Sequence, residues 1–133
     1  MNIPTELRYT NEHEWIRADG DIGTIGITDY AQDQLGDIVY LDLPAVGASL
    51  TKSEKLGEIE SVKAISDLYA PVSGEVLEVN QKAVDEPEAV NKEPYGNGWL
   101  IKLRLSDASE LDAMLNNEAY DELIVREMEE HTD

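Results

Sequence analysis

One lysine at a predicted turn is the first candidate for chemistry in this chain. The segment Glu54–Val79 is predicted to run strand, turn, strand, turn, strand, because apolar runs are separated by turn-forming residues. Lys63 falls at the first of these turns, with Glu58 and Glu60 before it and Asp67 after it. A lysine in a turn is most often a solvated charge, but its amine can also hold an acyl group. Because an ordinary lysine pKa is about 10.4, the acylating enzyme would have to provide the base.

Two glycines at fixed distances from Lys63 predict the corners around it. Gly74 follows in the turn-like segment Pro71-Val72-Ser73-Gly74, and Gly47 precedes the lysine on the other side. Glycine permits positive φ and proline fixes φ, so both glycines are predicted to lie at corners of a sharply turning β structure.

Composition limits what else the chain can do. Its 133 residues suffice for one domain with one apolar core. The formal net charge is −19 and the ten Lys and Arg residues are scattered, which argues against binding to nucleic acid. The acidic excess serves solubility alone or steers the chain toward basic docking surfaces, and composition leaves both open. The chain contains no cysteine, so any redox sulfur would have to come from a bound cofactor.

Signals for a membrane, a metal or an enzyme active site are missing from the sequence. There is no run of 18 apolar residues, no apolar signal core and no Arg-rich transit segment, so we expect a cytoplasmic protein, monomeric by default. His13 and His131 lie far apart, and the acidic residues Asp85, Glu86 and Glu88 lack the spacing of a calcium loop. No nucleophile–base pair or phosphate loop is evident, which argues against an enzyme.

Many short strands with helices toward the C-terminus predict a mainly β domain. Besides the three strands between residues 54 and 79, strands are predicted at 7–9, 14–17, 22–27, 37–43 and 99–105.

The helices are predicted from capping residues and helical spacing. A short internal helix is expected over residues 30–35, capped at Thr28-Asp29 and stopped by Gly36. Residues 81–94 are expected to form a loop, with at most a helical turn at 88–91. Two helical pieces are expected after residue 106: one capped by Ser106 or Asp107 that includes Leu111, Met114 and Leu115, and one over about 118–128.

The residues around Lys63 resemble a known family of swinging-arm carriers. Glu60-Ser61-Val62-Lys63-Ala64 is similar to the lysine motif of the H proteins of the glycine cleavage system, whereas a biotinyl domain would have methionine on both sides of its lysine. The resemblance runs in order over about residues 7–120. It includes Thr10–Trp15, Gly26–Gln32, Leu35–Val39, Pro94-Tyr95-Gly96 and Gly98-Trp99.

This resemblance implies a mainly β fold, a barrel-sandwich hybrid of short antiparallel strands with a short internal helix and C-terminal helices. Residues 1–133 would form a single lipoyl-carrier domain, with the lipoyl-type hairpin core at about 37–80 and a C-terminal helical segment at about 106–130.

The resemblance also implies a carrier of glycine catabolism and one-carbon metabolism rather than an enzyme. Lipoate would be attached covalently to Lys63 as lipoyl-lysine by a lipoate ligase or lipoyl transferase. The arm would take the aminomethyl group of glycine from the pyridoxal-phosphate-dependent glycine decarboxylase and deliver it to the tetrahydrofolate-dependent aminomethyltransferase. Dihydrolipoyl dehydrogenase would then reoxidise the dithiol.

Three further residues match positions that form the arm cleft in the family, namely Glu14, Asp67 and Gln34. The cargo carries a protonated amine, so a cleft that holds it should exclude water and offer a carboxylate. The alternative for Glu14 and for Asp67 is an ordinary surface acid. Gln34 stands where some family members have histidine, so a titratable contact is replaced by an amide that can still hydrogen-bond.

Two other functions remain open at this point. An H-like protein could serve as a depot or relay from which lipoyl groups pass to other complexes, and its lysine motif would be the same. An unmodified acidic interaction module would carry no adduct, and Lys63→Arg would have no effect on it.

Overall fold

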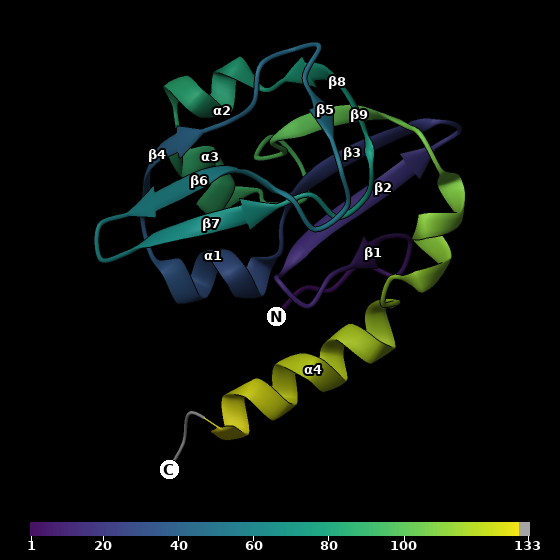
Figure 1. The fold of residues 1–133 in the computed structure, drawn as a ribbon. Helices are drawn as coiled ribbons and strands as arrows, with labels where there is room; N and C mark the ends of the chain where they lie inside the picture. Colours follow the sequence, from purple (N-terminus) through teal and green to yellow (C-terminus); the bar gives the residue numbers. More distant parts are fainter. Residues whose placement is uncertain (131–133) are drawn as a thin grey trace.

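Two antiparallel sheets form the body of the molecule, and the C-terminal helix lies outside them, below β1 in the view of Figure 1. The computed structural model describes residues 1–130. The larger sheet has the order β1-β2-β3-β9-β8-β5, and the smaller sheet has the order β4-β6-β7. The strands are β1 Arg8–Tyr9, β2 Glu14–Asp19, β3 Ile22–Ile27, β4 Ile38–Asp42, β5 Ser49–Leu50, β6 Lys55–Ser61, β7 Ile65–Tyr69, β8 Gly74–Val79 and β9 Ile101–Leu105. The predicted mainly β fold with a short internal helix and a C-terminal helix is confirmed.

One apolar cluster joins the inner faces of both sheets. Ile16 and Ile25 come from the larger sheet, Ile59 and Leu68 come from the smaller one, and each is at most 3% exposed. Burying a side chain of this size stabilises a fold by about 1.5–3 kcal/mol. The alternating apolar residues of the sequence therefore hold the two sheets face to face.

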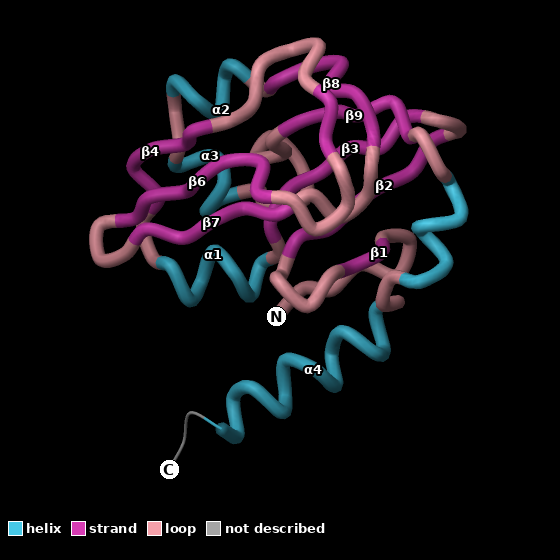
Figure 2. The backbone as a smooth tube through the Cα atoms, viewed as in Figure 1, coloured by secondary structure: helices cyan, strands magenta, loops and turns pink. Residues whose placement is uncertain are grey.

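The predicted strand–turn–strand around Lys63 is the β6–β7 hairpin. Its strands pair antiparallel, with Glu58 opposite Asp67, and the other edge of β6 pairs with β4. Residues on one face of this sheet are buried and those on the other are exposed, as expected for a strand with one solvated face. The turn at residues 62–64, drawn as a loop in Figure 2, protrudes at the end of the three-stranded sheet.

Gly47 and Gly74 are both required, but for different physical reasons. Gly47 has a φ of 92°, so its prediction as a positive-φ corner is confirmed. Gly74 is instead the first residue of β8 and is absent from the positive-φ positions, so the predicted corner there is wrong. A Cβ at Gly74 would collide with the carbonyl oxygen of Arg104 in β9. This glycine is needed for close strand approach rather than for a turn.

Helix α1 (Asp29–Leu35) begins and ends where the sequence predicts. The hydroxyl of Thr28 accepts a hydrogen bond from the backbone N–H of Ala31 at 3.2 Å. Gly36 ends the helix with a φ of 81°.

The segment after β8 folds into two short helices, α2 (Gln81–Asp85) and α3 (Glu88–Lys92). The predicted loop is therefore wrong for α2, whereas the predicted helical turn is confirmed as α3. Asn80 caps α2 by accepting from the backbone N–H of Ala83. Ala83 and Val90 are fully buried, so packing supplies the stability that the polar sequence does not suggest.

The C-terminal part contains a 3₁₀ helix, η1 (Ala108–Ala113), and α4 (Asn117–Glu130). Asp107 caps η1, as predicted. The first helical piece was expected to include Met114 and Leu115, and this is wrong for both. Met114 is the extended residue that follows η1, and Leu115 exchanges backbone hydrogen bonds of 2.9 Å with Tyr9. The second piece, expected over about 118–128, is confirmed as α4.

A second apolar cluster docks α4 against the larger sheet. Tyr120 stacks on Tyr9 with 4.6 Å between ring centroids, and its hydroxyl lies 2.8 Å from Nδ1 of His13 and 2.6 Å from Oγ1 of Thr28. Nε2 of His13 lies 2.9 Å from Glu127. Within residues 1–130, no helix is long and apolar enough to cross a membrane.

Candidate functional site

Ser61 organises the turn that carries Lys63. Its backbone N–H donates to the carbonyl of Ala64 at 2.8 Å. Its hydroxyl oxygen accepts from the backbone N–H groups of Lys63 and Ala64 at 3.3 and 3.1 Å. Such side-chain bonds to the turn's own amides favour one turn conformation. Ser61 is 8% exposed, whereas Lys63 is exposed. The hydrogen-bonded turn is therefore held in place by a buried serine, and the lysine side chain projects from it.

The tip is also tied to the corner between α1 and β4. The backbone N–H of Val62 donates to the carbonyl of Asp37 at 3.0 Å. The Lys63 side chain lies over Gly36, where a Cβ atom would be 3.5 Å from Cε and 4.0 Å from Nζ of the lysine. Within residues 1–130, the Lys63 ammonium has neither an ion pair nor a hydrogen bond, so an enzyme would not have to break one to reach it.

Two of the acids expected around Lys63 pair with a different lysine. Nζ of Lys55 lies 2.7 Å from Glu58 and 3.2 Å from Asp67, and the hydrogen bond to Glu58 contributes most to raising the pKa of Lys55. Glu58 and Asp67 stand directly opposite each other, where two like charges repel. Lys55 offsets that repulsion, and the negative charge that these acids direct at Lys63 is reduced accordingly.

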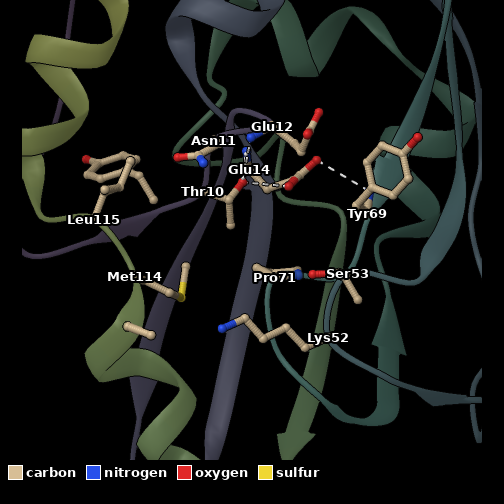
Figure 3. A pocket seen from close by; sticks show the side chains of 13 residues that line it. Thr10, Asn11, Glu12, Glu14, Lys52, Ser53, Tyr69, Pro71, Met114 and Leu115 are labelled. Atoms are coloured by element: carbon tan, nitrogen blue, oxygen red, sulfur yellow. Dashed lines mark hydrogen bonds between the residues drawn. The ribbon is translucent and has the colours of Figure 1, made fainter.

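A cavity of about 470 Å³ opens between the β1–β2 connection, the end of β7 and the segment after η1. Figure 3 shows the carboxylate of Glu14 between Thr10 and Tyr69, with Met114 and Leu115 on the side of the cavity away from Tyr69. Oε1 of Glu14 accepts from the hydroxyl of Thr10 at 2.7 Å, and Oε2 accepts from the backbone N–H of Tyr69 at 3.4 Å. The cavity thus combines apolar walls with two carboxylates, the buried one of Glu14 and the exposed one of Glu12.

Burial raises the pKa of Glu14 to about 7. The residue is 2% exposed, and the hydrogen bonds from Thr10 and Tyr69 lower its pKa by less than burial raises it. Near neutral pH the carboxyl group is therefore divided between its protonated and ionised forms. A cation that entered the cavity would favour the ionised form and pair with it.

The structure separates the three predicted cleft residues. Glu14 lines the cavity, whereas Asp67 and Gln34 are not among its lining residues. Asp67 accepts at 3.4 Å from the hydroxyl of Tyr69, which does line the cavity. Gln34 is exposed in the last turn of α1, two residues before Gly36 and therefore near the root of Lys63.

Sequence reasoning missed the residues that surround Glu14. Thr10 and Tyr69 hold its carboxylate, Lys52 reaches across the lower part of the cavity in Figure 3, and Met114 forms part of the opposite wall. Thr10 lies in a segment that the resemblance covers, so a signal existed there. No local pattern marks the others, because tertiary contacts bring them to the cavity.

Metal binding finds no support in the described part of the chain. Among residues 1–130 there is no group of three His, Asp or Glu residues that could hold a metal ion. His13 contacts Tyr120 and Glu127 instead. His131 lies outside the described residues.

Comparisons with known proteins agree with the fold and the lysine motif. The family model for the glycine cleavage H-protein matches residues 7–127. A glycine cleavage system H protein of Bacteroides thetaiotaomicron is 58% identical over 120 residues, covering 90% of this chain and 95% of that protein. One from Carboxydothermus hydrogenoformans is 53% identical over 127 residues, covering 96% and 98%. The crystal structure of an H protein from Mycobacterium marinum superimposes with a TM-score of 0.84 at 40% identity, covering 90% of this chain and 97% of that one.

The fold and the exposed hairpin lysine define a swinging-arm carrier, a protein that presents a group to enzymes and catalyses nothing itself. The family match makes this class specific, since it extends over most of the chain. The chain belongs to the glycine cleavage H-protein family, the lipoyl carriers of the glycine cleavage system.

Proposed function

We propose that Lys63 is the residue on which this chain carries its lipoyl group. The observation that carries the proposal is the placement, on a turn fixed by Ser61, of an exposed amine that has no ion pair or hydrogen bond among residues 1–130. Covalent attachment needs an amine that an enzyme can reach, and delivery between enzymes needs an arm with a defined starting point. Attached there, the lipoyl group would supply a disulfide whose S–S bond opens when one sulfur takes the aminomethyl carbon, and the group would remain on the lysine as a dithiol once that carbon is passed on.

The cavity residues fit this cargo. The amine of the cargo is protonated near neutral pH, and the buried carboxyl group of Glu14 can accept it as a charge-assisted hydrogen bond. Met114 and Leu115 line the same space with apolar side chains. We assign Glu14 to the far end of the arm, Gln34 to its root and Asp67, through Tyr69, to the region between them.

The proposed partners follow from this cargo. Glycine decarboxylase would load the arm, the aminomethyltransferase would unload it, dihydrolipoyl dehydrogenase would reoxidise it, and a lipoate ligase or lipoyl transferase would build it. A net charge of −19 supports brief encounters with basic docking surfaces. We further propose that residues 1–133 act as one monomeric, cytoplasmic carrier domain.

Intact-mass measurement tests the attachment site. The chain is produced together with a lipoate ligase and lipoate, alongside Lys63→Arg and the control Lys82→Arg, which changes an exposed lysine of α2. The wild-type and control chains should gain the mass of one lipoyl group, and Lys63→Arg should gain none. Glycine-dependent aminomethyl transfer should follow the same pattern. A lipoyl adduct on Lys63→Arg would overturn the assignment, and a lipoylated wild type that takes no aminomethyl group from glycine decarboxylase would indicate a relay role.

A further inference from the structure

Four exposed apolar side chains surround the lysine-bearing turn. Val39, Tyr40, Val62 and Ile65 are 52%, 53%, 69% and 64% exposed, and we call them the tip patch. Tyr40 and Ile65 stand in one row across the outer face of the smaller sheet, because both lie opposite Glu60 of β6. Val62 directly precedes the lysine. The patch therefore covers the turn and the sheet end next to it.

These apolar residues depart from the pattern of their own sheet. A solvated sheet face is normally polar, and the next row on this face consists of Asp42, Glu58 and Asp67. Single exposed apolar residues need no explanation. Here they gather where the fold presents its candidate attachment amine, with the acids Asp37 and Glu60 among them. Apolar side chains interspersed with acids indicate a contact surface for a protein that offers apolar and basic groups together.

We propose that the tip patch is the docking surface for the enzyme that attaches lipoate, an inference that rests on the proposed function. Attachment brings an activated acyl carbon to Nζ of Lys63. The amide C–N bond forms, while the bond from the acyl carbon to its leaving group, a phosphate or a thiolate, breaks and the leaving group keeps the electron pair. The ammonium gives up two protons to basic groups of the enzyme. An enzyme in this position has to cover Val62 and the residues beside it.

The other partners react with a different part of the arm. Decarboxylase, aminomethyltransferase and dehydrogenase act on the sulfur-bearing end of the arm, which the attached chain carries away from the turn. The patch is also small, which suits an enzyme that must release the carrier after one attachment. Its position therefore favours the attaching enzyme over the enzymes that use the finished arm.

A matched pair of variants tests this assignment. Val62→Thr lies in the patch and Val46→Thr lies outside it, at 69% and 65% exposure, so both changes replace a similarly exposed methyl by a hydroxyl. Ile65→Thr adds a second patch position and keeps a β-branched side chain in β7. Initial rates of lipoylation by a purified ligase with ATP and lipoate are followed by intact mass. We expect kcat/KM to fall about tenfold for each patch variant and to stay unchanged for Val46→Thr.

A second measurement separates docking from loss of structure and from loss of function. All variants are lipoylated to completion with excess ligase, and their Tm and rate of glycine-dependent aminomethyl transfer should equal those of the wild type. Equal lipoylation rates for Val62→Thr and Val46→Thr would overturn the proposal. So would normal lipoylation with slow aminomethyl transfer, which would assign the patch to another enzyme, or a lower Tm in step with the rate. If the wild type itself gains no lipoyl mass, the proposed function fails first.

Discussion

The backbone N–H of Tyr69 donates to the carboxylate of Glu14 across 3.4 Å, and this hydrogen bond joins the two sheets. Glu14 begins β2 in the larger sheet, and Tyr69 ends β7 in the smaller one. The strand that starts beside the lysine-bearing turn therefore ends at the carboxylate in the cavity. One hairpin strand thus links the proposed attachment point to the proposed cargo site, and its backbone sets the separation between them.

Replacing Glu14 should make the stability of the protein less dependent on pH. Because burial raises its pKa from 4.5 to about 7, the folded chain keeps a proton in this range that the unfolded chain gives up. The free energy of unfolding of the wild type therefore falls as pH rises from 4.5 to 7. The free energy of unfolding of Glu14→Gln should exceed that of the wild type by up to about 3 kcal/mol above pH 7 and by little below pH 4.5. Each tenfold change in proton affinity corresponds to about 1.4 kcal/mol.

Urea denaturation from pH 4.5 to 8 measures this difference. Glu75→Gln, which changes an exposed acid of β8 outside the cavity, is the control and should run parallel to the wild type. If the curves for Glu14→Gln and wild type stay parallel across the range, the carboxyl group of Glu14 is not held in the way we describe.

The same substitution should shorten the lifetime of the cargo. An amide at position 14 would lose the ionic part of the hydrogen bond to the cargo amine, a loss of about 1.5 kcal/mol, so hydrolysis of the loaded carrier should be about tenfold faster. Asp67→Asn should have a smaller effect, because Asp67 is exposed and pairs with Lys55. Ammonia release from the isolated loaded carrier gives both rates. A larger effect at position 67 than at position 14 would reverse our ordering of the two acids.

Tyr120→Phe should loosen α4 from the sheet. The hydroxyl of this fully buried residue bonds to both His13 and Thr28, and its removal would leave two partly or fully buried polar groups without that partner. We expect a loss of about 1–3 kcal/mol in the free energy of unfolding. Tyr40→Phe, at an exposed position, is the control and should cost less than 0.5 kcal/mol. Equal stability of the two variants in chemical denaturation would show that the ring stacking on Tyr9 carries the docking alone.

Asn91→Ala should weaken the corner to which the lysine turn is tied. Its amide oxygen accepts from the backbone N–H of Ile38 at 2.9 Å, and its nitrogen donates to the carbonyl of Gly36 at 2.9 Å. These bonds hold the end of α1 to the start of β4, so their loss should cost about 1–3 kcal/mol. It should also lower hydrogen-exchange protection at the Val62 amide, whose acceptor is Asp37 in the same corner. Unchanged protection at Val62 would show that the turn is held by Ser61 alone.

Local signals were sufficient to predict the elements of the lysine hairpin and the first helix. A hydroxyl at Thr28, a glycine at Gly36 and the alternating residues of β6 and β7 act within a few residues of one another, so the sequence displays them directly. Helix α2 was missed because its support is tertiary. The polar sequence gives no sign of the burial of Ala83, which appears only in the folded chain.

The candidate site also contains residues that the sequence indicated and residues that only the folded structure brings together. Lys63 and Glu14 were accessible from sequence because they lie in segments that match the family. The cavity around Glu14 was not, since Tyr69 and Met114 come from positions 55 and 100 residues further along the chain and meet it only through packing of β7 and the segment after η1.

The glycines on either side of Lys63 should respond differently to the same substitution. Gly47 has a φ of 92° with open space around a Cβ, so Gly47→Ala should cost about 1–2 kcal/mol of backbone strain. Gly47→Asn should cost less, because asparagine tolerates positive φ. At Gly74 a Cβ meets the backbone of Arg104, so alanine and asparagine should both destabilise by about 1–3 kcal/mol or more. Thermal unfolding of the four variants measures the contrast, and a rescue by asparagine at position 74 would mean that backbone conformation, not strand approach, requires glycine there.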